Sequence, residues 1–113
     1  MKNKLFFLSV LCLLTLNSCK NEKMTCIITS PKADAIFSEY QSIPITVEAS
    51  TTKGSIIQVQ IVVDDEVIES LTKPPYNFTI PSGTIPVGMH ILSAEAFSSG
   101  GNSEVAAIYI TIE

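Results

Sequence analysis

The segment from Ile56 to Val63 alternates between two sides of an extended backbone more clearly than any other part of the chain. It reads Ile-Ile-Gln-Val-Gln-Ile-Val-Val, which puts Gln58 and Gln60 on one side and Ile57, Val59, Ile61 and Val63 on the other. A period of two with β-branched residues on one side predicts a strand that is buried on one face. Asp64-Asp65 interrupts the pattern and residues 66–71 resume it, which predicts a hairpin.

Similar alternating segments occur along the rest of the chain, separated by residues that favour turns. We expect strands at residues 25–30, 43–49, 76–80, 89–97 and 105–112, with a short segment at 33–37 that switches sheets. Proline and glycine lie between these segments, and proline cannot donate the hydrogen bond that continues a ladder. No window beyond the N-terminal segment has apolar residues at helical spacing. The pattern predicts an all-β sandwich of about seven strands.

The N-terminal segment differs from the remainder in composition. Lys2 and Lys4 precede an apolar run from Leu5 to Leu16 that contains only two polar residues, Ser9 and Thr15. The run is too short to span a bilayer and is typical of a secretory signal peptide. We therefore expect residues 1–18 to be cleaved.

The residues at the end of that segment, Leu16-Asn17-Ser18-Cys19, resemble the lipobox of bacterial lipoproteins. Leu16, Ser18 and Cys19 match the pattern, and Asn17 departs from it. The resemblance implies that Cys19 is acylated and becomes the mature N-terminus, with residues 19–24 as a short lipidated tether to the cell envelope. Three acyl chains, at about 0.8 kcal/mol per buried CH₂, would hold it permanently. The alternative is an ordinary cleaved signal with an incidental cysteine.

Two features of the sequence limit the compartment in which the protein resides and the class of partner that it can bind. Lys20 stands where an aspartate would favour inner-membrane retention, so we expect the outer membrane, in a leaflet that the sequence leaves open. Without residues 1–18, five lysines face eleven acidic residues, a formal balance of −6, and there is no arginine. This excludes the basic surface that nucleic-acid binding requires.

Cysteine usage limits how the domain is stabilised. With residues 1–18 cleaved and Cys19 acylated, Cys26 is the one free thiol, so no intramolecular disulfide forms and packing must stabilise the single small core.

The segments together resemble a bacterial Ig-like domain of the kind found in secreted and surface proteins. The matching pieces are Ile28-Thr-Ser-Pro31, Val59-Gln-Ile-Val-Val-Asp64, Pro75-Tyr76, Gly88-Met-His90-Ile-Leu92, Ala94-Glu-Ala96 and Gly101-Asn102. Two positions depart from the family: Asp64-Asp65 replaces Asp-Gly, and Ser98 replaces an aspartate before the last turn. The resemblance implies an immunoglobulin-like sandwich over residues 25–113, with a non-catalytic role in binding, adhesion or spacing.

Few residues could carry chemistry. His90 is the only histidine, and its neighbours in the alternation are core residues, so a structural histidine bonded to nearby backbone is favoured over a catalytic or metal-binding one. No nucleophile elbow and no zinc-ligand spacing is present. Cys26 lies on the side of Ile28, as a buried inert thiol would. We therefore expect no enzyme, no cofactor and no metal.

One acidic concentration, formed by Asp64, Asp65, Glu66 and Glu69, raises the alternative of a weak calcium site. Calcium prefers several oxygens gathered on one loop, but this spacing matches no known loop motif. A solvated turn is the favoured interpretation.

The main functional hypothesis concerns the outward sides of three strands: the central strand, residues 89–97 and the last strand. If these strands share a sheet, their outward residues are more apolar than a solvated face requires, although β-propensity alone accounts for them equally well. The outward residues are Ile56, Gln58, Gln60, Val62, Ile91, Glu95, Phe97, Val105 and Tyr109. Among them we expect the partner-binding face to consist of Gln58, Gln60, Val62, Ile91, Glu95, Phe97 and Tyr109.

We expect the partner to be an envelope or extracellular protein. A polysaccharide is second, because the chain has no tryptophan. The sequence thus favours a lipid-anchored binding or adhesion module. Two alternatives stay open: a tethered enzyme inhibitor with a protruding loop at 84–88 or 98–102, and a spacer or remnant of a larger surface protein.

Overall fold

The computed structural model describes residues 22–113, so the predicted signal peptide, Cys19 and the first tether residues lie outside the described residues. Eight strands form where the sequence predicts about seven. They are β1 (Met24–Ser30), β2 (Ala35–Phe37), β3 (Ile43–Thr51), β4 (Ile56–Val63), β5 (Glu66–Leu71), β6 (Tyr76–Ile80), β7 (Gly88–Ser98) and β8 (Ser103–Ile112). No helix within this range is long and apolar enough to cross a bilayer.

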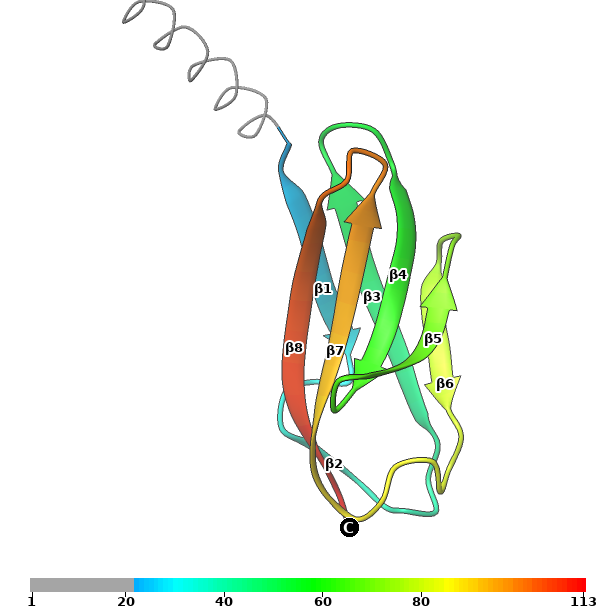
Figure 1. The fold of residues 1–113 in the computed structure, drawn as a ribbon. Helices are drawn as coiled ribbons and strands as arrows, with labels where there is room; N and C mark the ends of the chain where they lie inside the picture. Colours follow the sequence, from blue (N-terminus) through cyan, green and yellow to red (C-terminus); the bar gives the residue numbers. More distant parts are fainter. Residues whose placement is uncertain (1–21) are drawn as a thin grey trace, which may run out of the picture.

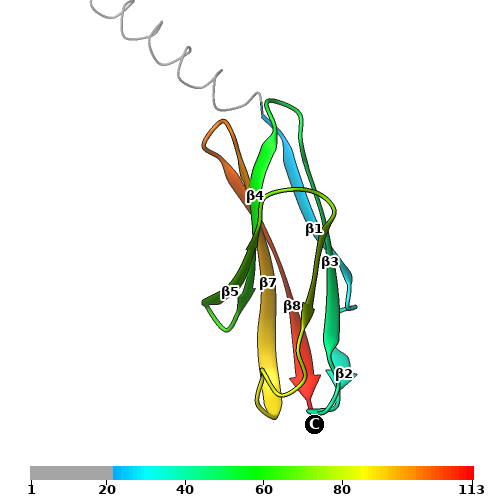
Figure 2. The same ribbon diagram turned by 90° about the vertical axis from the view of Figure 1, so that its right-hand side faces the viewer.

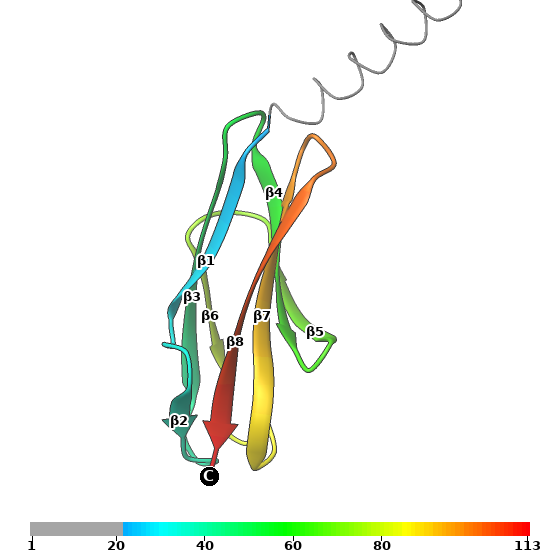
Figure 3. The ribbon, with the colours of Figure 1, turned by 90° about the vertical axis from the view of Figure 1, so that its left-hand side faces the viewer.

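The strands form two sheets that face each other (Figure 1). One sheet has the order β1-β3-β6 and the other the order β2-β8-β7-β4-β5. Figures 2 and 3 show the two layers from the side, with their strands running along the same long direction. Neighbouring strands are antiparallel except β2 and β8, which are parallel. The predicted immunoglobulin-like β-sandwich is confirmed, and the chain switches sheets between β1 and β2 as expected.

The core lies between the sheets and follows the alternation of each strand. In β7, Leu92, Ala94 and Ala96 have no exposed surface, and the residues between them point outward. The small side chains of Ala94 and Ala96 allow β1 to approach closely, since Cys26 Sγ lies 3.5 Å from the carbonyl oxygen of Ala94. The other large, fully buried side chains are Ile45, Val59, Ile61, Ile80 and Ile110.

The start of β4 departs from the predicted pattern. Ile56 pairs with Ser98 and Gln58 pairs with Phe97, so the register shifts and Ile57 is an extra residue in a bulge. Ile57 is 50% exposed, whereas Ile56 packs against the core. The expectations that Ile57 is buried and that Ile56 faces outward are therefore wrong.

A two-residue turn joins β4 to β5. Its residues Asp64 and Asp65 have φ angles of 50° and 71°, both in the left-handed region. Positive φ at both central positions is the type I′ geometry that matches the twist of a hairpin. The second position usually takes glycine in the resembling family, and Asp65 occupies it here at a conformational cost.

Candidate partner-binding face

The outward side of the five-stranded sheet brings together the residues that the sequence analysis grouped. We call it the outer face. Strands β4, β7 and β8 lie side by side, with Gln58 opposite Phe97 and Gln60 opposite Glu95. Ile91 is opposite Tyr109 on the other flank of β7. The shared sheet therefore places Gln58, Gln60, Val62, Ile91, Glu95, Phe97, Val105 and Tyr109 on one surface.

Apolar side chains concentrate in the part of this face nearest the C-terminus. Tyr109 is 52% exposed and Met89 is 69% exposed, and both lie next to Ile91. Large apolar residues with this exposure are ordinary when scattered, whereas a contiguous group indicates a contact surface. We call this group the apolar patch: Ile36, Val62, Val67, Met89, Ile91 and Tyr109.

Three members of the patch escaped the sequence analysis. Val67 is paired with Val62, and Ile36 and Met89 are both paired with Thr111. Met89 could have been assigned to this face from the sequence, because it lies two residues before Ile91 and therefore points to the same side of the strand. The places of Ile36 and Val67 depend on β2 and β5 flanking the sheet, which no local pattern indicates.

The other part of the outer face is more polar. Gln58, Gln60 and Glu95 lie here beside the half-buried Phe97 and the exposed Val105. Cross-strand neighbours on one sheet face are close enough to contact each other. The surface thus offers amide groups and one carboxylate next to an apolar patch, which is the composition of many protein contact surfaces.

His90 sits at the start of β7 and links three segments. Its Nε2 lies 2.7 Å from the carbonyl oxygen of Pro86, and its Nδ1 lies 2.5 Å from Asp64 Oδ2. The other carboxylate oxygen of Asp64 accepts a 2.9 Å hydrogen bond from the backbone N–H of Ile91. These bonds raise the pKa of His90 and lower that of Asp64, chiefly through their mutual hydrogen bond. The backbone bond is that of a structural histidine, and the link to Asp64 was not predicted.

The remaining acidic residues do not gather around one point. Among residues 22–113, no three His, Cys, Asp or Glu side chains are grouped as metal ligands would be. Asp64 is engaged by His90 and Ile91. Cys26 is buried, as its place in the alternation predicted, and desolvation raises the pKa of its thiol.

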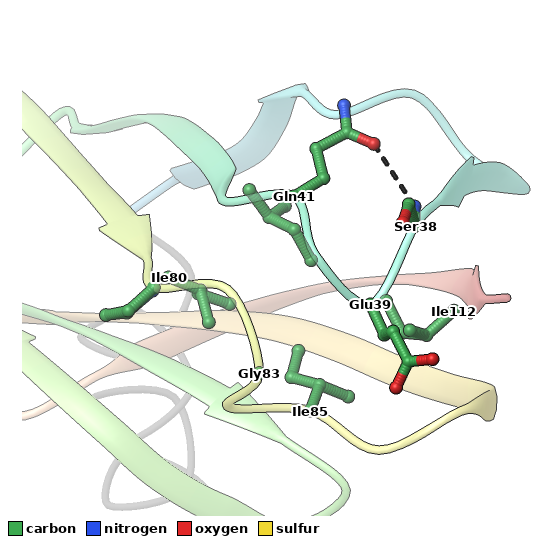
Figure 4. A pocket seen from close by; sticks show the side chains of 9 residues that line it. Ser38, Glu39, Gln41, Ile80, Gly83, Ile85 and Ile112 are labelled. Atoms are coloured by element: carbon green, nitrogen blue, oxygen red, sulfur yellow. Dashed lines mark hydrogen bonds between the residues drawn. The ribbon is translucent and has the colours of Figure 1, made fainter.

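The concave sites of the sandwich differ widely in size. A cavity at the C-terminal end has a volume of about 10 Å³, which is barely room for one water molecule. Figure 4 shows its lining side chains between the 38–43 segment and the 80–85 segment, with a hydrogen bond from Ser38 to Gln41. A cleft of about 430 Å³ lies between the β4–β5 hairpin and residues 84–86, next to His90. A groove of about 370 Å³ borders Glu48, Pro74, Pro75 and Asn77.

The turn after β7 is closed by Ser98, which stands where the resembling family has an aspartate. Ser98 is buried, and its hydroxyl oxygen accepts a 3.3 Å bond from the backbone N–H of Asn102. The carbonyl oxygen of Asn102 accepts a 2.9 Å bond from the backbone N–H of Ser98. Ser98 thereby closes the turn with a hydroxyl in place of a carboxylate.

Comparison with known proteins gives a family and several structural relatives. A family model described as bacterial Ig domain matches residues 25–94. The long isoform of an ulvan lyase from Alteromonas sp. is 28% identical over 94 residues, which cover 76% of this chain and 9% of that protein. The chain thus spans about a tenth of the length of this curated relative.

Solved structures support the same fold. Fibronectin(III)-like modules of Clostridium thermocellum CbhA are 26% identical, with a TM-score of 0.70, and the match covers 79% of this chain and 97% of theirs. SGBP-B of the mixed-linkage glucan utilization locus of Bacteroides ovatus, solved with a mixed-linkage heptasaccharide, is 15% identical, with a TM-score of 0.56. That match covers 79% of this chain and 24% of SGBP-B, and at this identity it supports the fold alone.

Proposed function

The chain belongs to the bacterial Ig domain family, and we propose that it is a lipid-anchored envelope module that binds a partner protein through its outer face. Small Ig-like modules are typically non-catalytic and serve in binding or spacing, including in carbohydrate-active surface proteins such as those matched above. The proposal adds the anchor at Cys19, the outer membrane and the class of partner.

The apolar patch is the observation that carries the proposal. A sandwich covers the inner faces of its sheets, and an outward face that meets only water needs no group of large apolar side chains. Tyrosine, methionine and isoleucine together with two glutamines match the composition of protein contact surfaces better than that of a solvated sheet. The same surface has no tryptophan, which makes it a poor platform for sugar rings.

Capture from envelope extract tests the patch with two variants of equal exposure. Tyr109→Ser removes an aromatic group from the patch, where Tyr109 is 52% exposed. Ile27→Ser removes a 53% exposed apolar group from β1, in the other sheet. We expect one protein to bind the tagged full-length chain saturably, Tyr109→Ser to weaken this binding at least tenfold, and Ile27→Ser to leave it unchanged.

Three outcomes would each overturn part of the proposal: the binding surface, the class of partner or the binding role itself. Equal capture by Tyr109→Ser would place the contact elsewhere, and saturable binding to a polysaccharide panel alone would make the partner a glycan. No binding by correctly folded protein would favour a spacer, which the small share of the lyase that this chain matches also supports. Fatty-acid labelling of the chain and of Cys19→Ser tests the anchor independently.

The inhibitor alternative receives less support. The 84–88 segment is tied back by the bond between Pro86 and His90, and the 98–102 turn is closed by Ser98 and Asn102. Both segments are thus held against the strands that they join. The apolar patch lies on the outer face and includes no residue of either segment.

A further inference from the structure

We infer that one end of the sandwich rests on the lipid headgroups, so that the domain stands on the membrane with its C-terminal end outward. This inference rests on the lipid anchor proposed at Cys19. We call the end concerned the anchor end. It consists of Glu22, Lys23, the 52–55 loop and the 99–102 turn, which lie together where β1 begins (Figure 1).

The bonded structure begins before β1. The Thr51 hydroxyl donates a 2.5 Å hydrogen bond to Glu22 Oε2, and Asn102 Nδ2 donates another to Glu22 Oε1. The backbone N–H of Lys23 donates a 2.9 Å bond to Thr52 Oγ1, and its carbonyl oxygen accepts one from Thr52 N. Residues 22–24, which the sequence analysis assigns to the tether, are thus attached to the sandwich.

The remaining tether is too short to let the domain move away. Three peptide units separate Cys19 from Glu22, and a fully extended chain covers at most about 3.6 Å per residue, or about 11 Å in all. The headgroup layer on each side of a bilayer is itself about 5–8 Å thick. An acylated Cys19 therefore keeps Glu22 at or just above the headgroups, together with every segment bonded to it.

The anchor end is one bonded unit and not a set of independent loops. Ser99 donates a 2.8 Å backbone bond to the carbonyl oxygen of Ser55, and Ser55 N donates a 3.1 Å bond to Ser99 Oγ. Gly54 has φ +71°, which favours glycine, and a Cβ there would lie 2.3 Å from Ser99 Oγ, so a larger residue would displace the hydroxyl that bonds to Ser55 N. A short tether on one corner of this unit holds the whole end near the surface.

The distribution of charge favours the same orientation. The half of the sandwich that contains the anchor end carries three lysines, Lys23, Lys53 and Lys73, and five glutamates, Glu22, Glu48, Glu69, Glu95 and Glu104. Hydrogen bonds to Thr51 and Asn102 lower the pKa of Glu22, and these bonds occupy its carboxylate. The opposite half carries one lysine, Lys32, against six carboxylate side chains: Asp34, Glu39, Asp64, Asp65, Glu66 and Glu113. An anionic membrane repels this acidic half within a Debye length of about 10 Å at 0.1 M salt.

The orientation makes the outer face available. The long direction of the strands joins the anchor end to the end of the sandwich that contains the C-terminus (Figures 1 and 3). With the anchor end on the headgroups, this direction lies along the membrane normal. Met89 and Thr111 pair near the outward end of β7 and β8, whereas Phe97 and Ser103 pair at the anchor end. The apolar patch therefore lies in the outward half, within reach of a partner protein and away from the lipid.

Fluorescence quenching tests the orientation, because the chain has no tryptophan of its own. The lipidated full chain is reconstituted into phosphatidylethanolamine–phosphatidylglycerol vesicles that contain a headgroup nitroxide lipid. Lys53→Trp places a fluorophore at the anchor end, and Tyr40→Trp places one at the opposite end, where Tyr40 is 84% exposed. We expect the nitroxide to quench Lys53→Trp at least threefold more than Tyr40→Trp.

A tether variant and sedimentation separate the ways in which the inference could fail. Twelve Gly/Ser residues inserted after Lys20 span about 20 Å on average and should relieve the quenching of Lys53→Trp while the protein still sediments with vesicles. Equal quenching of the two tryptophans in sedimenting protein would overturn the orientation alone. Protein that is unlabelled by fatty acid and does not sediment would overturn the anchor, and the orientation with it.

Discussion

His90 Nδ1 lies 2.5 Å from Asp64 Oδ2, and this contact joins the β4–β5 turn to the start of β7 across 26 residues of sequence. The other ring nitrogen faces the carbonyl oxygen of Pro86. Both partners are hydrogen-bond acceptors, so both ring nitrogens donate only when the imidazole is protonated. The raised pKa of His90 follows from this arrangement.

We predict that the domain loses stability between pH 5.5 and pH 8. A pKa raised above 6.5 in the folded state contributes stability that is complete below 6.5 and disappears as the pH rises through the folded value. The lowered pKa of Asp64 adds stability that is lost only below 3.8, outside this range. Because Asp64 is half exposed, we expect a loss of about 0.5 kcal/mol, or about 2–4 °C in Tm. Thermal unfolding at the two pH values measures it.

His90→Gln is the matched variant, since glutamine cannot take up a proton. Its Tm should be lower than that of the wild type at pH 5.5, and the difference should shrink toward pH 8. The chain has no other histidine to titrate in this range. A wild-type Tm that does not change between the two pH values would show that folding does not raise the pKa of His90.

The two residues of the hairpin turn should respond oppositely to glycine. Asp65 has φ 71°, and its carboxylate makes no hydrogen bond within residues 22–113, so Asp65→Gly should stabilise the domain by about 0.5–1 kcal/mol. Asp64 has φ 50°, but its carboxylate bonds to His90 and to the N–H of Ile91. Asp64→Gly should therefore destabilise the domain by about 1 kcal/mol. Urea midpoints measure both changes, and a shift of the same sign in both variants would contradict the prediction.

Much of the sandwich can be predicted from the sequence, because the alternation of apolar and polar residues in each strand shows which of its sides is buried. Leu92, Ala94 and Ala96 keep one parity through β7, and Ile110 and Ile112 do the same in β8. A period of two needs no knowledge of neighbouring strands. Ile57 shows the limit, because its exposure depends on a bulge that arises from the pairing of β4 with β7. A single extra residue reverses the face of every residue on one side of it.

The candidate site was only partly predictable for the same reason. Ile91, Phe97 and Tyr109 were placed on the correct side of the sheet, because each alternates with buried residues on a strand that is easily recognised. Val67 and Ile36 join the outer face only because β5 and β2 flank the sheet. The pair of Asp64 and His90 likewise requires the register that places Val63 opposite Leu92. Long-range pairing of this kind leaves no trace in local composition.

Ala94 and Ala107 provide a test of how closely the two sheets approach. Ala94 has no exposed surface and lies where Cys26 of β1 meets β7, so Ala94→Leu adds three heavy atoms between packed sheets. Overpacking of a filled core costs about 1–3 kcal/mol, and the free energy of unfolding should fall by this amount. Ala107 is exposed on the outward side of β8, where leucine meets solvent. Ala107→Leu should change the free energy of unfolding by less than about 0.5 kcal/mol. Equal urea midpoints for the two variants would mean that space remains between β1 and β7, and that the alanines are not what allows the sheets to approach.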